Sequence, residues 1–392
     1  MSFTLTQEQD VGGAGVVRDF SLNASGQSVG FSEVTAGATY DPVLWSVTGT
    51  ATVLTDVAGG IGWGSARALN DGGQSVGFEL MPNGQSAAVM WSSTGVATLL
   101  GTGGGLATPG SVTSAWAINT KGQVVGNVKT PTGGFEAELW FGGNTTRLSD
   151  PGLRGYAWVS ALNSKGFSAG YVQTSATADE GVMWGPRGTA TTLTVSGQIS
   201  SQALAINNAG FSVGWAQTAT GIEAVRWAQD GTAEVLHGLP GSTNSMATAE
   251  NGHGMSIGWS ATAAGGTDAI LWGARGNIAA ILKDPGGQGK EWALAVNDNG
   301  KSVGYADIAG GGTEAVLWQV DGKATNLSPL LPGWTNTEAT GINLAGDILG
   351  SGTVAGHTEA FELIPSSAAA TSTHYHLVTS PDAASLTLAS HS

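Results

Sequence analysis

An eightfold repeat is the strongest constraint on the fold of this chain. The pattern Asn-x-x-Gly-x-x-x-Gly recurs along the sequence, and successive asparagines lie 44 to 49 residues apart. These asparagines are Asn23, Asn70, Asn119, Asn163, Asn207, Asn251, Asn297 and Asn343. A regular period of this length is typical of propellers, solenoids and other repeat architectures. We therefore expect an array of eight equivalent units.

Each unit contains four short apolar runs separated by polar turns. The run before the asparagine is rich in alanine, the second contains G-x-S-x-G or a variant, and the third ends in Leu-Trp or a related pair. A glycine turn then leads to a fourth run such as ATVL or ATTL. Runs of about five residues rich in β-branched and aromatic side chains, separated by Asn/Gly turns, are typical of antiparallel strands.

Four strands in a repeat of this length predict an all-β protein, an eight-bladed β-propeller of four-stranded antiparallel blades. Blades converge at a central axis and diverge outward, which suits alanine in the first run and tryptophan in the third. The third-run tryptophans are Trp45, Trp91, Trp140, Trp184, Trp227, Trp272 and Trp318. A β-solenoid is the alternative fold, but it does not account for this gradient in side-chain size.

The two ends of the chain predict how the ring closes. The eighth unit stops after three runs, at FELIP, and FTLTQE at residues 3–8 resembles the fourth run TVLTDV at residues 52–57. The N-terminal strand is therefore expected to complete the last blade and close the ring. We expect the propeller to cover residues 1–365 and a C-terminal tail to cover residues 366–392.

The G-x-S-x-G motif raises the possibility of a serine hydrolase, because it is the pattern of a nucleophile elbow. The motif occurs six times, with Ser28, Ser75, Ser168, Ser212, Ser256 and Ser302 at its centre, and Val124 and Ile348 replace the serine in the other two units. One elbow needs one strained serine and one histidine beside it. A repeated and replaceable serine instead indicates a packing position, so we predict no catalytic residue.

Composition excludes several classes of function. The chain has 14 Lys and Arg against 29 Asp and Glu, a net charge of −15. Such an acidic surface repels phosphate backbones and anionic lipid, so neither nucleic acid nor membrane is an expected partner. The sequence contains no run of about 18 apolar residues, the length that a membrane-spanning helix needs. The absence of cysteine excludes disulfides and thiolate metal sites.

An acidic residue precedes the third run in seven units. These residues are Asp41, Glu136, Glu180, Glu223, Asp268, Glu314 and Glu359. Calcium needs six to eight oxygen ligands, and one carboxylate in each unit is too few. The acids are expected to cap loops or face solvent, and we predict neither a metal nor a cofactor.

The repeat unit resembles the HAF repeat of extracellular bacterial proteins. The resemblance rests on A-x-A-[LI]-N-x-x-G-x-x-x-G followed by A-x-L-W, and it covers residues 16–363. The chain departs from the family at the step that names it, because Glu-Ala-Val is more frequent than His-Ala-Phe before Leu-Trp. The resemblance implies an extracellular repeat protein and supplies no catalytic residues.

The residues that depart from the repeat are the candidates for function. Five tryptophans lie in or just after the loops that lead into the units, and they are Trp63, Trp116, Trp158, Trp292 and Trp334. Arg67 occupies the same neighbourhood in the second unit. In a propeller these loops surround one mouth of the channel, where exposed aromatic rings could bind a ligand. The alternative is that the tryptophans cover the joints between blades.

Trp158 and Trp292 are the strongest of these candidates, because each stands five residues before its unit's asparagine. Trp215 and Trp259, and the equivalent Phe31, Phe78, Tyr171 and Tyr305, follow the second glycine of the motif and are assigned to the core.

Two classes of function remain open from the sequence. The first is a non-enzymatic extracellular binding protein, with weak multivalent binding of glycans or other cell-surface and matrix components through loop aromatics. The second is a structural subunit of an extracellular filament, surface layer or biofilm matrix. MSFTLTQEQD has no signal-peptide pattern, so the tail is expected to be a type I secretion signal or an arm for self-assembly.

Overall fold

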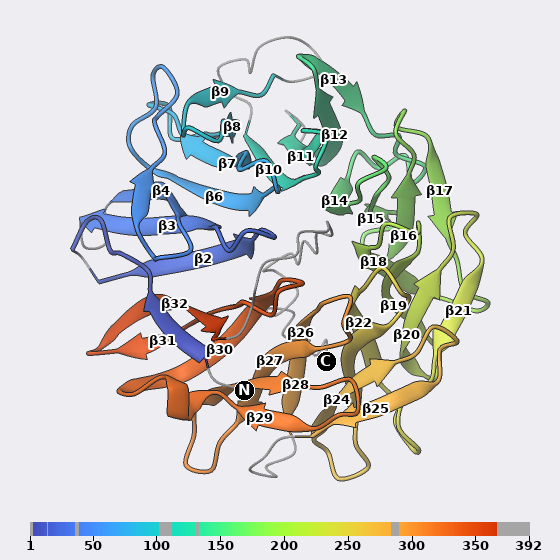
Figure 1. Cartoon of the computed structure of the whole chain (residues 1–392). Helices are drawn as coiled ribbons and strands as arrows, with labels where there is room; N and C mark the ends of the chain where they lie inside the picture. Colours follow the sequence, from blue (N-terminus) through green and yellow to red (C-terminus); the bar gives the residue numbers. More distant parts are fainter. Residues whose placement is uncertain are drawn as a thin grey trace.

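Eight antiparallel sheets are arranged around a central axis, which confirms the predicted eight-bladed propeller (Figure 1). This computed structural model describes residues 3–13, 15–35, 39–101, 112–130, 133–283 and 290–366. The C-terminal tail lies outside the described residues except for Ser366. Within the described ranges, no helix is long and apolar enough to cross a membrane.

Each blade is a meander of four strands, which are given below in order from the innermost to the outermost. Blades 1 to 3 are β2 (Val17–Leu22), β3 (Ser28–Thr35), β4 (Thr39–Trp45) and β5 (Ala51–Val53); β6 (Gly64–Leu69), β7 (Ser75–Leu80), β8 (Ser86–Trp91) and β9 (Ala97–Leu99); and β10 (Thr113–Ile118), β11 (Val124–Lys129), β12 (Phe135–Phe141) and β13 (Asn144–Arg147). Blades 4 and 5 are β14 (Ala157–Leu162), β15 (Ser168–Gln173), β16 (Asp179–Trp184) and β17 (Ala190–Leu193); and β18 (Ser200–Ile206), β19 (Ser212–Thr218), β20 (Gly221–Trp227) and β21 (Ala233–Leu236).

The last three blades follow the same order. Blade 6 is β22 (Ser245–Glu250), β23 (Ser256–Ala261), β24 (Thr267–Trp272) and β25 (Ile278–Leu282), and blade 7 is β26 (Glu291–Val296), β27 (Ser302–Asp307), β28 (Thr313–Trp318) and β29 (Ala324–Asn326). A short 3-10 helix, η1 (Ser328–Leu330), leads into blade 8, which is β30 (Trp334–Ile342), β31 (Ile348–Val354), β32 (His357–Pro365) and β1 (Phe3–Gln7).

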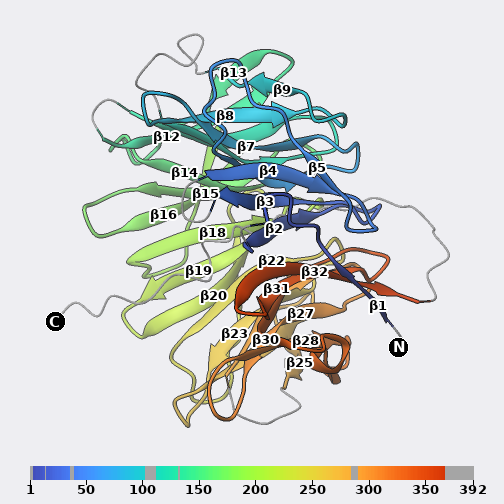
Figure 2. The ribbon, with the colours of Figure 1, turned by 90° about the vertical axis from the view of Figure 1, so that its left-hand side faces the viewer.

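The N-terminal strand closes the ring, as the sequence predicts. β1 pairs antiparallel with β32, with Phe3 opposite Pro365 and Gln7 opposite Phe361, and the side view shows it along the outer edge of blade 8 (Figure 2). The chain then continues past blade 1, where the carbonyl of Gln9 accepts a hydrogen bond of 2.9 Å from Nε1 of Trp45. The first residues thus join blade 8 to blade 1.

The third-strand tryptophans fill the outer part of the blade joints. All seven are buried, with exposed fractions of 0% to 3%. Six of them donate Nε1 to a carbonyl of the preceding blade, as in the 2.7 Å bond from Trp184 to Ser149. The predicted core position is confirmed, and the indole also forms a polar link between blades.

The repeated asparagines form a closed ring of hydrogen bonds. Nδ2 of each asparagine donates to the backbone carbonyl of the next blade's asparagine, over distances of 2.9 to 3.4 Å. The last bond runs from Asn343 back to Asn23 at 3.1 Å. Meanwhile Oδ1 accepts backbone N–H groups of the asparagine's own turn, as with Gln123 and Lys121 at Asn119. One side chain therefore fixes both its hairpin and the joint between blades.

The two glycines of the motif have different physical roles. The first lies in the hairpin turn at positive φ, 76° at Gly26 and 90° at Gly166, where a side chain would be strained. The second faces a β-bulge in the innermost strand, and a Cβ there would overlap a carbonyl of that strand, that of Trp158 in the case of Gly170. The motif is therefore a requirement of backbone geometry.

The serine between these glycines is a packing residue. The six serines are 0% to 1% exposed, and Ser28 donates its hydroxyl to Glu8. Each G-x-S-x-G motif lies at the hairpin between the first two strands of its blade, whereas a nucleophile elbow joins a strand to a helix. The structure therefore agrees with the packing interpretation.

Candidate functional site

The topology places the loops that lead into each blade at one end of the propeller and the asparagine hairpins at the other. We call the first end the loop face. The first strand of each blade starts there, the second ends there and the third starts there, because consecutive strands are antiparallel. Side chains at those three positions therefore gather around the central axis at the loop face.

Every innermost strand has a bulge at the residue three positions before its asparagine. In blade 3, Ala115 and Ala117 pair with consecutive residues of β11, so Trp116 between them has no partner across the ladder. The equivalent bulge residues are Phe20, Arg67, Ser160, Leu204, Thr248, Leu294 and Thr340. Because a bulge bends its strand and re-aims a side chain, it interrupts the simple alternation of the strand.

Half-buried rings form one continuous network across blades 1 to 4. We call it the aromatic arc, and its members are Phe20, Phe31, Tyr40, Trp63, Arg67, Phe78, Trp116, Phe135, Tyr156, Trp158 and Tyr171. Neighbouring ring centroids within it lie 5.0 to 6.4 Å apart. Such edge and offset contacts are the favourable geometries for aromatic pairs.

Arg67 links the two halves of the aromatic arc. Its guanidinium carbon lies 4.5 Å from the ring centroid of Phe20, 5.4 Å from that of Phe78 and 5.5 Å from that of Trp116. These distances are within the range of cation–π attraction. Arg67 therefore holds rings of three adjacent blades in place.

A polar pair, Asp179 and Gln202, borders the aromatic arc in blade 4. Trp158 and Tyr171 are directly opposite on β14 and β15, and Tyr171 stacks on Tyr156 at 6.4 Å between ring centroids. Oδ2 of Asp179 accepts a 2.8 Å hydrogen bond from Nε2 of Gln202, on the innermost strand of the next blade. Burial, with a smaller effect of the Asp179 charge, raises the pKa of Tyr156 even though a hydrogen bond with Tyr171 lowers it. The site in blade 4 therefore consists of the rings of Tyr156, Trp158 and Tyr171 and the polar side chains of Asp179 and Gln202.

Blade 7 repeats this arrangement with different polar groups. Trp292 and Tyr305 are directly opposite on β26 and β27 and stack with 6.4 Å between ring centroids. Burial and the nearby charges of Glu338 and Asp307 raise the pKa of Tyr305 to about 12. Glu338 lies on the innermost strand of the next blade, the position that Gln202 has beside blade 4. Trp259 of blade 6 completes the cluster, 5.5 Å from Trp292.

The structure brings together four of the six candidate residues. Trp63, Arg67, Trp116 and Trp158 all belong to the aromatic arc, and Trp292 lies in the separate blade 7 cluster. Trp334 packs edge-on against the fully buried Phe361, 5.3 Å between centroids, and borders the core of blade 8.

The aromatic residues that follow the second glycine also belong to the candidate site. Tyr171, Tyr305 and Trp259 are predicted from the sequence to lie in the core, but all three are only half-buried and contact the loop-face rings. Their position in the second strand could have shown this, because Tyr171 and Tyr305 lie directly opposite the candidate tryptophans Trp158 and Trp292 of the first strand.

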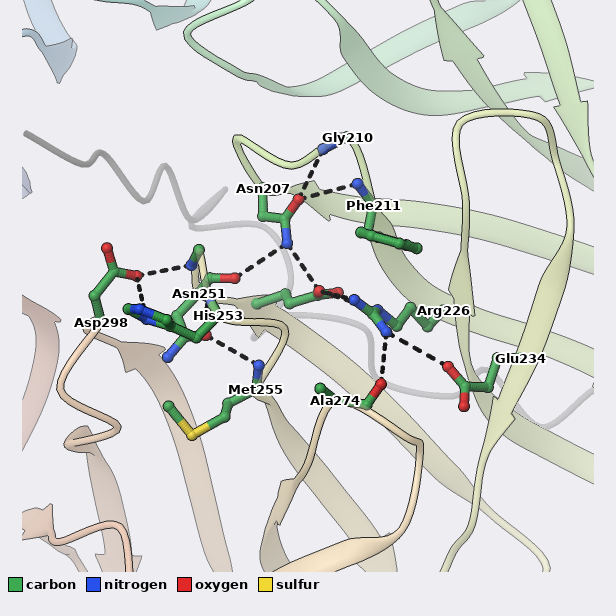
Figure 3. Close-up of polar contacts among 12 residues, drawn as sticks. Asn207, Gly210, Phe211, Arg226, Glu234, Asn251, His253, Met255, Ala274 and Asp298 are labelled. Atoms are coloured by element: carbon green, nitrogen blue, oxygen red, sulfur yellow. Dashed lines mark hydrogen bonds and ion pairs between the residues drawn. The ribbon is translucent and has the colours of Figure 1, made fainter.

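A buried charged cluster between blades 5 and 6 is the strongest candidate for catalysis by charge alone (Figure 3). Nε and Nη2 of Arg226 each lie 3.0 Å from Oε1 of Glu250, and Nη1 donates to the carbonyl of Ala274. The guanidinium also covers the ring of Phe211 at 3.8 Å. Oε1 of Glu250 accepts a further bond from Asn207 of the asparagine ring, so this cluster supports the ring.

Arg226 and Glu250 occupy positions that are apolar in most blades, which predicts an unequal response to mutation. Replacing Arg226 by Leu alone should cost about 3 kcal/mol, because it leaves the buried Glu250 without its cation. Replacing both by Leu should cost less than about 1.5 kcal/mol, because an apolar pair can substitute for a buried ion pair. Chemical denaturation of both variants measures the two costs, and equal costs would contradict the explanation that Arg226 mainly neutralises the buried Glu250.

The seven acids that the sequence places before the third runs lie at the second or third residue of the third strands, near the loop face. Among the residues that the structure describes, no group of three or more His, Asp or Glu could hold a metal ion. Glu136 pairs with Arg147 at 2.6 Å, and Glu314 accepts a hydrogen bond from Asn326. Glu136 and Glu314 therefore bind partners within their own blades.

A polar pocket lies at the asparagine end, among the innermost strands of blades 7, 8 and 1. It encloses about 600 Å³, part of it open to solvent, and Phe20, Thr340 and Asn343 contribute to its wall. The amide of Asn343 already bonds Asn23 and Asp347. Two of its lining side chains, Thr340 and Asp298, each have an oxygen without a hydrogen-bond partner among the described residues, and Phe20 is the one aromatic side chain in its wall.

Comparisons with known proteins place the chain by its fold. No family model matches the sequence, and no curated protein matches it. Among solved structures, a prolyl endopeptidase matches with 12% identity and a TM-score of 0.55 over 86% of this chain and 54% of the enzyme. Puromycin hydrolase matches with 13% identity and a TM-score of 0.51, over 90% of this chain and 61% of the hydrolase.

A lectin is also among the similar structures. BP39L from Burkholderia pseudomallei matches with 10% identity and a TM-score of 0.43, over 83% of this chain and 98% of the lectin. This chain spans less than two thirds of the length of the two enzymes. Similarity at these identities shows the propeller fold alone.

Proposed function

We propose that this chain is a non-enzymatic extracellular protein that binds glycans weakly at several sites on its loop face. The observation that carries the proposal is the pair of equivalent sites in blades 4 and 7. In each, a tryptophan and a tyrosine are cross-strand partners, and a polar side chain of the next blade lies beside them. The extracellular location rests on the resemblance to the HAF repeat.

The chemistry of these sites suits sugars. Sugar rings stack their apolar C–H faces on aromatic side chains, and Tyr O–H and Trp N–H groups reach polar partners from the same surface. Gln202 and Asp179 at blade 4, and Glu338 at blade 7, can bond hydroxyl groups beside the stacked ring. A few convergent polar groups beside apolar rings are typical of small-ligand sites.

Charge favours neutral or cationic glycans. The chain carries a net charge of −15, and carboxyl groups border both sites, so an anionic sugar would be repelled. The two sites lie on blades 4 and 7 and share no ring contact among those described. Each site would bind weakly, and a long glycan that reaches both would gain affinity from avidity.

The geometry also argues for binding without catalysis. The repeated serines are buried in blade joints, and the Arg226–Glu250 pair supports the asparagine ring. A glycosidase needs two carboxyl groups on either side of the scissile bond. At blade 4 the two groups beside the aromatic rings are one carboxyl and one amide. Blade 7 has two carboxyl groups, Glu338 and Asp307, near Tyr305, so a carboxyl pair is not a feature that the two equivalent sites share.

A glycan array tests this proposal. We expect wild type to bind neutral or amino-sugar glycans and to ignore sulfated ones, and Trp158→Ala/Trp292→Ala to lose at least tenfold in apparent affinity. Ser114→Ala is the matched control, because Ser114 has the equivalent position in blade 3. Absence of wild-type binding to any glycan, or full binding by the double variant, would contradict the proposal and favour a structural subunit of an extracellular assembly.

A further inference from the structure

Three carboxyl groups meet inside the seam, the junction where β1 completes blade 8 beside blade 1. Glu8 directly follows β1, Asp19 lies on β2 and Glu362 lies on β32. Their exposed fractions are 2%, 6% and 2%. The seam therefore buries acidic side chains from the three strands that it joins.

These groups have few hydrogen-bond partners. Oε1 of Glu8 accepts the hydroxyl of Ser28, but Oε2 of Glu8, both oxygens of Asp19 and Oε1 of Glu362 have none among the described residues. A charged carboxylate buried in this way is shielded from bulk solvent and has no ion pair among the described residues, which disfavours ionisation strongly.

The neighbouring titratable groups add negative charge. Asp347, in the turn before β31, acts on Glu362, and Glu8 acts on both Asp19 and Glu362. The other charged groups of these strands affect other carboxyl groups. The charge of Arg18 lowers the pKa of Glu338, and at Glu359 the charge of Asp10 raises the pKa while that of His357 lowers it. Glu33 on β3 is also buried. None of the ion pairs within the described residues includes Glu8, Asp19 or Glu362.

Burial is the main cause that keeps these groups neutral. It raises the pKa of Glu8 to about 8 and, with the charges of Asp347 and Glu8, the pKa of Glu362 to about 9. Burial and the charges of Glu8 and Glu362 raise the pKa of Asp19 well above its ordinary value. At neutral pH the folded seam therefore holds protons that an unfolded chain would have released.

We propose that Glu8, Asp19 and Glu362 form a pH-dependent latch, which holds the N-terminal strand docked while they are protonated and releases it when they ionise. The folded seam binds more protons than the released strand between the ordinary carboxyl range and about pH 9. Docking is therefore strongest at mildly acidic pH and weakens as pH rises through this window. The charges then repel one another across the strands that the seam joins.

Hydrogen exchange of the β1 amides tests the latch. Protection factors for residues 3–8, corrected for the intrinsic rate at each pH, should fall at least tenfold between pH 6 and pH 9.5. Protection of the innermost strand of blade 4 should change less than threefold. Glu8→Gln/Asp19→Asn/Glu362→Gln, which mimics the protonated groups, should keep β1 protected at pH 9.5. If the triple variant does not fold, Glu362→Gln alone should retain at least half of the lost protection.

A buried acid elsewhere is the matched control. Burial raises the pKa of Glu79, in blade 2, to about 7, so Glu79→Gln should change the overall pH dependence of stability without protecting β1. The latch is wrong if β1 protection is independent of pH in wild type, or if neutral seam variants lose it as wild type does. Restoration of β1 protection at pH 9.5 by millimolar calcium would also overturn it, because the carboxylates would then be a cation site.

Discussion

Removal of residues 1–9 is expected to lower the free energy of unfolding by about 5 kcal/mol or more. The deletion takes away β1 and its ladder with β32, and each backbone hydrogen bond contributes about 1 kcal/mol. It also removes the packing of Phe3 and Leu5 on the core of blade 8 and the carbonyl that accepts Nε1 of Trp45. Urea denaturation of the truncated and full chains measures the loss.

A synthetic peptide of residues 1–10 is the control for this deletion. Added in excess, it should restore most of the lost stability, because the missing strand needs no covalent link to pair with β32. Without it, the bare edge of β32 should promote self-association. A truncated chain that unfolds at the same urea concentration as the full chain would show that β1 does not close the ring.

Replacement of Trp184 by Ala is expected to cost about 3–5 kcal/mol, the range for removal of a large buried aromatic side chain. Trp184 is fully buried between blades 3 and 4, and the substitution also strands the Ser149 carbonyl that its indole bonds. Chemical denaturation measures the cost. Phe141→Ala is the control, because Phe141 is 49% exposed at the end of its strand, and it should cost less than about 1 kcal/mol.

A cost below about 1 kcal/mol for Trp184→Ala would contradict the packing of the blade joints. A cost in the expected range with an unchanged fold of the other blades would support independent joints, each filled by its own tryptophan. The stability of a repeat ring is then close to a sum of neighbour interactions.

The sequence predicts the propeller because its signals are local and repeated. Turn residues, strand length and the gradient in side-chain size depend on one unit at a time, and each of them recurs in seven or all eight units. The asparagine ring was not predicted, although every member was identified. The partner of Nδ2 lies on another blade, about one repeat away in the chain, so only the assembled ring shows that the two meet.

The candidate site was predicted in part for the same reason. Trp158 and Trp292 stand out as departures from the repeat, but their partners Tyr171 and Tyr305 occupy a position that is aromatic in most units. The bulge in each innermost strand shifts the alternation by one residue, so a simple two-residue period misplaces which side chains reach the loop face. Arg67 joins the aromatic arc only because its neighbours come from three blades.

The most direct test of the proposed function is the number of sugar sites on each chain. Isothermal titration with an N-acetylglucosamine tetramer and with a glucosamine tetramer should find two weak sites in wild type for at least one of these probes. Trp158→Ala and Trp292→Ala should each leave one site, the double variant none, and the control Ser114→Ala two. Binding of neither probe to wild type, or two sites remaining in the double variant, would contradict the account.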